Sequence, residues 1–197
     1  MRANKRKSPK SVVDFISEAG MLKRVRRSGW SVLGIRDAES VAEHSFRCAV
    51  IGYMLACMEK VPAERVIMMT LFNDIHEARI TDLHKMAQRY IDAYSAENKA
   101  FKEQIALLPE NIRKGLADTH TEYIDQKTKE SLIARDADIL ECLIQAKEYH
   151  AQGFTEAVKF MRKAPLLLKT DSAKEIWRYA KKNDINDWWV NLSNFKR

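Results

Sequence analysis

A short stretch of the chain, Leu71 to Asp82, gathers the residue types that a hydrolytic metal site requires. Its sequence, Leu-Phe-Asn-Asp-Ile-His-Glu-Ala-Arg-Ile-Thr-Asp, places three carboxylates, a histidine, a carboxamide and an arginine at the end of an otherwise apolar segment. Such groups are costly to bury unless they are paired or bind a metal. Asp74 and Glu77 are three residues apart and share one face if the segment is helical. The stretch therefore predicts one half of a metal site.

Two residues elsewhere could supply the other half. His44 follows a capping box, Ser40 to Glu43, which fixes the start of a helix. In that first turn the free amides and the helix dipole favour a neutral imidazole, as a metal ligand must be. Asp138 borders the apolar stripe of a long helical segment, whereas Asp136 is rotated away from it. An imidazole with two carboxylates suits a divalent cation such as Mn, Co, Fe, Zn or Mg, although a lone histidine at a helix start is more often structural.

Helices must position these side chains, because the sequence favours an all-α chain. Period-two alternation is scarce, glycine occurs 6 times and proline 4 times, and apolar residues recur at spacings of three and four. The segment 118–125 is expected to be a connection with His120 exposed, and Trp188 and Trp189 are expected to be packing anchors. The helices that the spacing predicts cover residues 12–23, 41–59, 63–78, 96–108, 127–149, 154–163 and 171–182, and another helical segment begins at Pro109.

Length and composition favour one domain and argue against a membrane or secreted protein. A chain of 197 residues can bury its core as one domain. We expect this domain at 11–197, with its core at 22–150, behind a disordered basic tail at 1–10. No apolar run approaches the roughly 20 residues that a membrane span requires, and the first residues lack the apolar segment of a secretory signal. We therefore expect a soluble, cytoplasmic protein. Its cysteines form no CxxC pair and are expected to be reduced core thiols: Cys48, Cys57 and Cys142.

The charge of the chain favours an anionic ligand. The net charge is +7 and the sequence pI is about 9.3, which suits a nucleotide, a nucleic acid or an acidic protein equally. Part of this charge lies in the run from Lys23 to Trp30, where four basic residues precede a glycine and the tryptophan. Taken alone, a run of this kind is usually a solvated face.

The order of the motifs resembles that of HD-domain metal-dependent phosphohydrolases. The family pattern is a histidine, then a histidine–aspartate pair near a helix end, then an aspartate, and here it falls on His44, Asn73–Asp74 and Asp138. The resemblance extends from about Leu22 to Tyr149 and implies an HD-type helical bundle with additional C-terminal helices. Three longer matches resemble the subgroup that contains bacterial 5′-deoxyribonucleotidases and their archaeal and eukaryotic relatives: Ser40-Val-Ala-Glu-His-Ser45, Asp74-x-x-Glu77-x-x-x-x-Asp82, and Asp136-Ala-Asp-Ile-Leu-Glu141 with Gln145-Ala-x-Glu-Tyr149.

This resemblance implies a role for each residue of the motifs. His44, Asp74 and Asp138 correspond to metal ligands. Glu77 corresponds to the residue that activates or orients the attacking water, and Asp82 to one that assists near the sugar or the leaving group.

The basic run gains a role from the same resemblance. Arg27 and Trp30 match a basic-aromatic segment that is expected to contact the phosphate and the nucleoside. Alignment is looser there, so Lys23, Arg24 or Arg26 could take the arginine's place. A guanidinium is well suited to a phosphate because it donates two parallel hydrogen bonds.

The chain departs from the family at Asn73, which stands where the family has the histidine of its HD pair. An amide oxygen can bind a hard cation but is a weaker ligand than imidazole for a transition metal. Three outcomes are open: Asn73 binds the metal and shifts preference towards Mg or Mn, His76 takes its place although it points roughly away, or the site binds metal poorly.

The function implied is metal-dependent release of phosphate from (deoxy)nucleoside 5′-monophosphates by a homodimeric enzyme. Two alternatives are an attenuated HD protein that binds nucleotides without turning them over, and a helical module that binds nucleic acid through the basic tail. No aromatic-basic RNA motif supports the second alternative.

Overall fold

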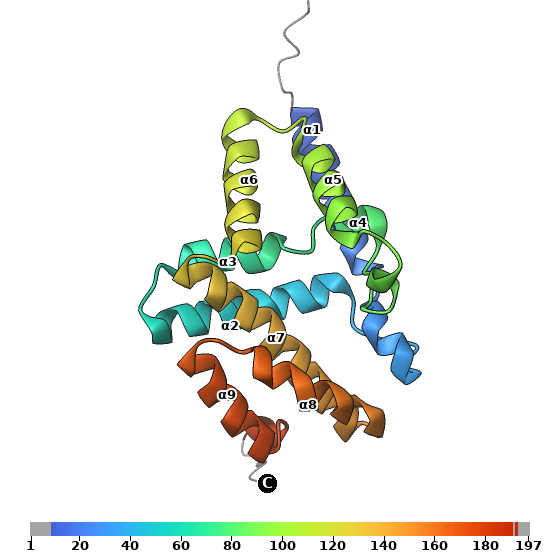
Figure 1. The fold of residues 1–197 in the computed structure, drawn as a ribbon, viewed down its shortest axis with the longest axis vertical. Coiled ribbons are helices and arrows are strands. Elements are labelled where there is room, and N and C mark those ends of the chain that lie inside the picture. Colours follow the sequence, from blue (N-terminus) through green and yellow to red (C-terminus); the bar gives the residue numbers. More distant parts are fainter. Residues whose placement is uncertain (1–8, 191, 193–197) are drawn as a thin grey trace, which may run out of the picture.

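The computed structural model describes residues 9–190 and 192, and regular structure within them is helical (Figure 1). An isolated antiparallel bridge joins Arg26 and Ser40. The expected all-α class is therefore confirmed. The α-helices are α1 (Pro9–Ala19), α2 (Val41–Glu59), α3 (Ala63–Phe72), α4 (Glu77–Ile80), α5 (Ala93–Ile105), α6 (Glu110–Asp125), α7 (Lys129–Ala151), α8 (Phe160–Lys163), α9 (Asp171–Lys182) and α10 (Asp187–Val190). Short 3₁₀ turns cover Gly20–Lys23, Ser28–Leu33, Ala87–Arg89, Thr155–Lys159 and Ala164–Leu167.

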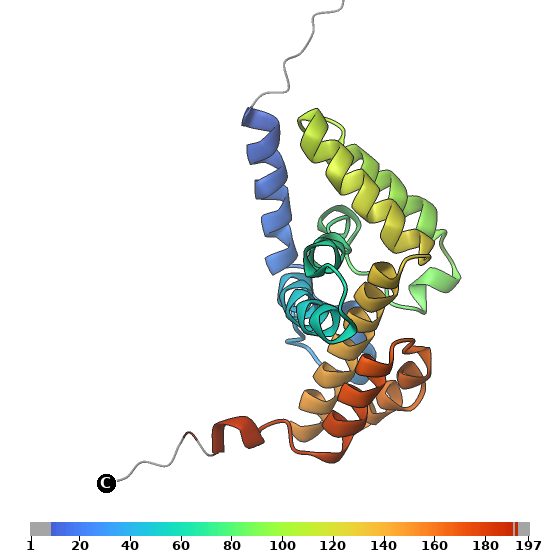
Figure 2. The ribbon, with the colours of Figure 1, turned by 90° about the vertical axis from the view of Figure 1, so that its left-hand side faces the viewer.

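The ends of the chain differ from the sequence-based expectation. Residues 1–8 of the expected tail lie outside the described residues, and its last two residues already belong to α1. Trp188 and Trp189 are exposed, so their expected role as packing anchors is wrong for the fold described. They lie on the short α10, which projects away from the other helices (Figure 2).

Helices α2, α3 and α7 form the centre of the fold. Each packs against the other two, and α7 crosses both of them in Figure 1. Gly52 allows the close approach of α2 and α3, because a Cβ atom there would lie 3.1 Å from side-chain atoms of both Val66 and Thr70. The residues that fill this centre are aliphatic and almost inaccessible to solvent: Leu55, Val66, Met69, Ile133, Leu140 and Leu143.

The start of α2 is fixed by the capping box that the sequence predicts. The Ser40 hydroxyl accepts a hydrogen bond from the Glu43 amide (3.2 Å), and the Glu43 carboxylate accepts one from the Ser40 amide (2.6 Å). Two backbone hydrogen bonds then hold the basic run beside the start of this helix. The Arg27 amide donates to the Glu39 carbonyl, and the Val41 amide donates to the Val25 carbonyl. Arg27 is thereby brought close to the first turn of α2.

The helix expected over 63–78 is interrupted. Helix α3 ends at Phe72, residues 73–76 form turns, and α4 begins at Glu77. The Ile75 amide donates to the Phe72 carbonyl, and the Glu77 amide donates to the Asp74 carbonyl. These hydrogen bonds span three residues and replace the four-residue bonds of an α-helix. Asp74 therefore lies in a turn between two helices, not on a continuous helical face with Glu77.

Three further local expectations are also wrong. Residues 118–125 are the last part of α6, and His120 is partly buried with its ring stacked on Phe101 at a centroid distance of 3.9 Å. Cys57 is exposed and is not a core thiol, unlike the buried Cys48. Asp136 is completely buried, although it is expected to be rotated away from the apolar stripe of its helix. Its carboxylate accepts hydrogen bonds from the backbone amides of Lys169 and Thr170, which precede α9.

The outer helices flank this centre on different sides. Figure 2 shows α1 on one side and the α5–α6 pair on the other, with α8 and α9 beyond α7. No helix in the described part of the chain has both the length and the apolar character needed to cross a bilayer.

Candidate active site

Three side chains from separate parts of the fold converge at one point. His44 lies in the first turn of α2, Asp74 in the turn after α3, and Asp138 in the middle of α7. The His44 Nε2 atom is 3.5 Å from Asp74 Oδ2 and 3.2 Å from Asp138 Oδ1. His44 is almost completely buried, and the two carboxylates are only slightly accessible. The predicted halves of the site are therefore adjacent in space.

The electrostatics of these groups differ from the sequence-based expectation for the histidine. Burial alone lowers the pKa of His44, but its surroundings, including the hydrogen bond with Asp138, raise that pKa above its usual range. Burial works against ionisation of Asp138, yet the bond with His44 and the charge of Arg135 hold its pKa well below its usual range. Asp138 therefore stays a carboxylate.

The second ring nitrogen of His44 is already engaged. Its Nδ1 atom lies 2.5 Å from Glu141 Oε2, a hydrogen-bonding distance that leaves no room for an ion between the two atoms. Cys48 Sγ is also close, at 3.4 Å from Nε2, but burial raises the pKa of this thiol to about 12. A protonated thiol is a poor metal ligand. The cluster of His44, Cys48 and Glu141 is therefore less suited to a metal than the Nε2 side of the ring.

The donor set on the Nε2 side fits a divalent cation. It offers one imidazole nitrogen and two carboxylate oxygens from three separate elements, and such mixed sets bind Zn, Mn, Fe or Co with positions left open. Glu77 lies beside this set, and its buried Oε2 atom has no hydrogen-bond partner among the residues that the structure describes. An unpartnered buried carboxylate oxygen is what a bound ion, water or substrate would satisfy.

The surroundings of Glu77 favour its protonated form. Burial, followed by repulsion from Asp74 and Asp82, raises the pKa of Glu77 well above its usual range. A carboxylate with a raised pKa is a stronger base than an ordinary one. Its position at the start of α4 places it on the cavity wall beside Asp74.

Arg27 is the member of the basic run that reaches the site. Its Nη1 atom is 3.4 Å from Asp74 Oδ2 and its Nε atom is 4.0 Å from Asp82 Oδ2. Asp82 Oδ2 also accepts a 2.7 Å hydrogen bond from the Ser28 amide, which ties the basic run to the segment after α4. Arg26 instead donates to the Ala38 carbonyl, away from the site.

Trp30 lies next to the site but belongs mainly to the core. Its ring packs edge-on against Tyr149 at a centroid distance of 5.1 Å and against Phe160 at 4.6 Å. Its Nε1 atom donates a 2.9 Å hydrogen bond to Glu39. The ring also contributes to the cavity wall, so it can limit the space at that wall.

Asn73 and His76 both line the cavity. The Asn73 amide donates a 2.7 Å hydrogen bond to Asp74 Oδ1. His76 is buried, and its Nδ1 atom has no hydrogen-bond partner within the described part of the chain. Because His76 lines the cavity, the expectation that it points away from the site is wrong. The break after α3 explains why the helical spacing gave the wrong direction for His76. Residues 73–76 form turns, so their side chains are not spaced around a helix axis.

Two of the three converging residues, Asp74 and Asp138, line a cavity of about 500 Å³. This volume suits a small molecule of the size of a mononucleotide. The inner wall carries the charged residues described above, and the outer wall comes from the loop after α4 and from α5 and α6. The outer residues include Lys85, Met86, Gln88, Glu97, His120 and Ile124.

Sequence reasoning did not assign a role to several residues that hold the site together. Glu141 contacts His44, Arg47 contacts Glu141, and Arg135 contacts Asp138 at 2.8 Å. The sequence contained a signal for two of these contacts. Arg135, Asp138 and Glu141 are spaced three residues apart, which predicts that their charges lie along one side of a helix.

The family of the chain follows from the fold and the site together. The HD domain model matches residues 19–177, and the chain belongs to the HD domain family. Its relatives include human 5′-deoxynucleotidase HDDC2, 30% identical over 141 residues that cover 71% of this chain and 69% of the human protein. The protein of the same name from Xenopus laevis is 33% identical over 141 residues, with coverages of 71% and 70%.

A solved structure supports the same assignment. A conserved hypothetical protein from Pyrococcus furiosus superposes with a TM-score of 0.74 at 31% identity, covering 87% of this chain and 99% of its own. The HD-type helical fold inferred from the sequence motifs is therefore confirmed.

Proposed function

We propose that this protein is a metal-dependent phosphohydrolase that releases phosphate from (deoxy)nucleoside 5′-monophosphates. The observation that carries the proposal is the convergence of His44 with Asp74 and Asp138, two carboxylates that line a cavity together with Arg27. The relatives named 5′-deoxynucleotidases support the substrate class. The net charge of +7 agrees with an anionic substrate.

His44, Asp74 and Asp138 would hold the metal, with Asn73 as a further candidate ligand. A divalent cation bound there supplies Lewis acidity to the phosphoryl group and lowers the pKa of water. Mn, Co, Fe, Zn and Mg all remain compatible with these ligands. The amide oxygen of Asn73 favours the harder members of this group.

Glu77 is the proposed general base. Its raised pKa and its unpartnered Oε2 atom suit it to accept the proton of the attacking water. Asp82 has a different task, because its carboxylate already holds the Ser28 amide and lies near Arg27. We assign Asp82 to positioning Arg27 and the sugar side of the substrate.

Arg27 is the proposed phosphate ligand. In the structure it offsets the charge of Asp74 and Asp82, and its remaining donors are available to phosphate oxygens. Trp30 would support the nucleoside from the cavity wall, while its ring stays fixed by Tyr149 and Phe160.

The experiment is a screen of nucleoside and deoxynucleoside 5′-monophosphates against Mg, Mn and Co, with released phosphate as the readout. We expect metal-dependent release that a chelator abolishes and that His44→Ala lacks. Nucleotide binding without release would support the attenuated alternative. Release that is equal in the wild type and in His44→Ala would contradict the proposal.

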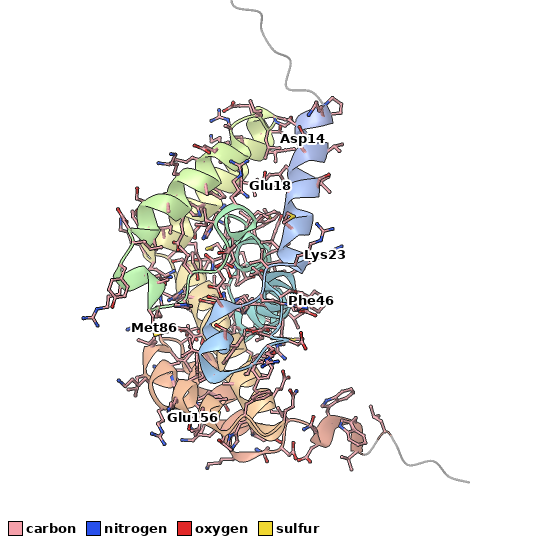
Figure 3. All side chains as sticks on the ribbon, turned by 90° about the vertical axis from the view of Figure 1, so that its right-hand side faces the viewer. Asp14, Glu18, Lys23, Phe46, Met86 and Glu156 are labelled. Atoms are coloured by element: carbon pink, nitrogen blue, oxygen red, sulfur yellow. The ribbon has the colours of Figure 1, made fainter. Side chains whose placement is uncertain are left out.

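We also propose that the protein forms a homodimer through α2. An exposed apolar row follows the side of this helix that no other described element covers, and such rows often mark protein interfaces. Phe46 projects from α2 in Figure 3 and belongs to this row. The other members are Val50, Tyr53, Met54 and Met58. A molar mass of two chains in light scattering, reduced to one chain by Phe46→Glu, would support the proposal, and a wild-type monomer would contradict it.

A further inference from the structure

A chain of buried hydrogen bonds lies behind the His44 ring. Glu141 Oε2 is 2.5 Å from His44 Nδ1, and the other oxygen, Oε1, accepts from Arg47 Nε at 2.9 Å. Arg47 also donates to Gln145 at 2.5 Å and to Glu148 at 2.7 Å. These bonds link the imidazole to three residues on the neighbouring helix.

The register of two helices builds this arrangement. His44 and Arg47 are three residues apart on α2, so both face α7. Glu141, Gln145 and Glu148 follow each other at spacings of four and three on α7, which places them along one stripe. The packing of α2 on α7 brings the two sets together.

The burial of Glu141 needs an explanation beyond stability. Its side chain is completely inaccessible, and both of its oxygens are used. Removing a carboxylate and a guanidinium from water is costly, and an apolar pair of similar volume often gives equal or greater stability. A buried carboxylate on the far nitrogen of a metal-binding histidine, in contrast, fixes the ring and raises its basicity.

We infer that Glu141 and Arg47 are positioning residues that direct the His44 Nε2 lone pair between Asp74 and Asp138. This inference rests on the proposed function, because it takes Nε2 as the ligand atom. Because a carboxylate only accepts hydrogen bonds, the ring donates from Nδ1 to Glu141, and in the neutral form that would bind a metal the lone pair then lies on Nε2. Arg47 in turn fixes the Glu141 carboxylate through its planar, multiply bonded guanidinium.

The outer end of this chain of bonds is separate from the cavity mouth. The Arg47 side chain is partly accessible to solvent. Its neighbour in the sequence is Phe46, and Met86 lines the cavity. Figure 3 shows Phe46 and Met86 on opposite sides of the fold. A substitution in the Arg47 group therefore does not alter the wall of the cavity.

The test compares two isosteric substitutions that each remove one acidic partner of Arg47. Glu141→Gln changes the residue that touches His44, whereas Glu148→Gln is the matched control that does not touch it. The readouts are the dissociation constant for Mn²⁺ by chelator competition and the melting temperature of the metal-free protein. We expect Glu141→Gln to weaken Mn²⁺ binding by about 10-fold to 100-fold, the range for residues that support metal-bound histidines. Glu148→Gln should change it less than about 3-fold.

A second variant covers the case in which Glu141→Gln does not fold. Arg47→Lys keeps the positive charge but loses the planar fork, so it should weaken Mn²⁺ binding by about 10-fold with a melting temperature near that of the wild type. An unchanged Mn²⁺ affinity in Glu141→Gln would overturn the inference but not the proposed function. If Glu141→Gln does not fold, an unchanged Mn²⁺ affinity in Arg47→Lys would have the same meaning. Equal losses in Glu141→Gln and Glu148→Gln that follow the melting temperatures would also overturn it. A wild type that binds no Mn²⁺ through His44 would overturn both the inference and the proposed function.

Discussion

Asn73 holds Asp74 by a 2.7 Å hydrogen bond from its side-chain Nδ2 atom to the neighbouring carboxylate Oδ1 atom. The donor end of the amide therefore faces a proposed ligand, and only the Asn73 oxygen is free to face a metal. The carboxamide at this position orients Asp74 in addition to any direct role.

Asn73→His should strengthen transition-metal binding. Imidazole is a better ligand than an amide for Mn or Co, so we expect Co²⁺ to bind at least about 10-fold more tightly. Competition with a chelator measures the change. Asn186→His adds a histidine on an exposed residue and is the control; equal gains in both variants would show that the effect is not specific to the site.

Glu77→Gln should remove turnover and leave binding. The amide cannot accept the water proton, and loss of a general base typically lowers kcat by about 100-fold to 10,000-fold. Steady-state phosphate release gives kcat, and calorimetry with a nucleoside monophosphate gives affinity. Glu103 is exposed, so the substitution Glu103→Gln serves as the control. A variant with more than a tenth of the wild-type kcat would remove Glu77 from this role.

Arg27→Lys should raise KM more than it lowers kcat. Lysine keeps the charge but cannot donate two parallel bonds to a phosphate, so an increase in KM of about 10-fold is expected. Arg24→Lys is the control because Arg24 contacts only the nearby Met21 sulfur among the bonds described. Identical kinetics in the two variants would exclude Arg27 as the phosphate ligand.

Two glutamates at the start of α2 should have opposite effects on stability as the pH changes. Burial, followed by repulsion from Glu141, raises the pKa of Glu39 to about 7. The folded state then binds a proton more tightly than the unfolded state, so the free energy of unfolding falls as the pH rises from about 4.5 to 7. Glu39→Gln should therefore raise the melting temperature at pH 8 more than at pH 5.

Glu43 is the matched control for that measurement. Hydrogen bonds with Ser40 lower the pKa of Glu43, so its contribution is present at neutral pH and is lost as the pH falls through the lowered value. Glu43→Gln should lower the melting temperature at pH 8. The same pH dependence in both variants would contradict this assignment.

Gly52→Ala should destabilise the fold, whereas Gly115→Ala should not. The new methyl group at 52 meets the buried side chains of Val66 and Thr70 at 3.1 Å, and overpacking of this kind costs about 1–3 kcal/mol. The methyl group at 115, within α6, meets nothing within 4 Å and should add about 0.5–1 kcal/mol through helix propensity. Urea unfolding measures both, and equal changes would contradict the close approach of α2 and α3.

Local signals predicted some helix boundaries correctly. The capping box at Ser40 gives the observed start of α2, and α9 begins at the predicted Asp171 with Thr170 as its N-cap. Both motifs satisfy backbone donors within three residues, so their effect is visible in a short window of sequence.

The break between α3 and α4 could not be predicted in the same way. Asp74 contacts Arg27 and His44, which are far away in the sequence, and these contacts favour a turn where periodicity predicts a helix. Glu141 was visible as part of a motif, but its contact with Arg47 depends on the register between α2 and α7. Position along a helix therefore predicted that His44 and Asp138 lie at the edge of the core, but neither the burial of Asp136 nor the partner that each side chain finds.

The cavity draws its two walls from different parts of the chain. The charged floor depends on α2, α7 and the turn after α3, whereas the outer wall comes from residues 83–124. The outer wall contributes none of the residues proposed to hold the metal or to move the proton. Mutations in the α5–α6 pair can therefore change which nucleotides are accepted while the hydrolytic chemistry stays the same, so that one catalytic framework can acquire new substrates during evolution.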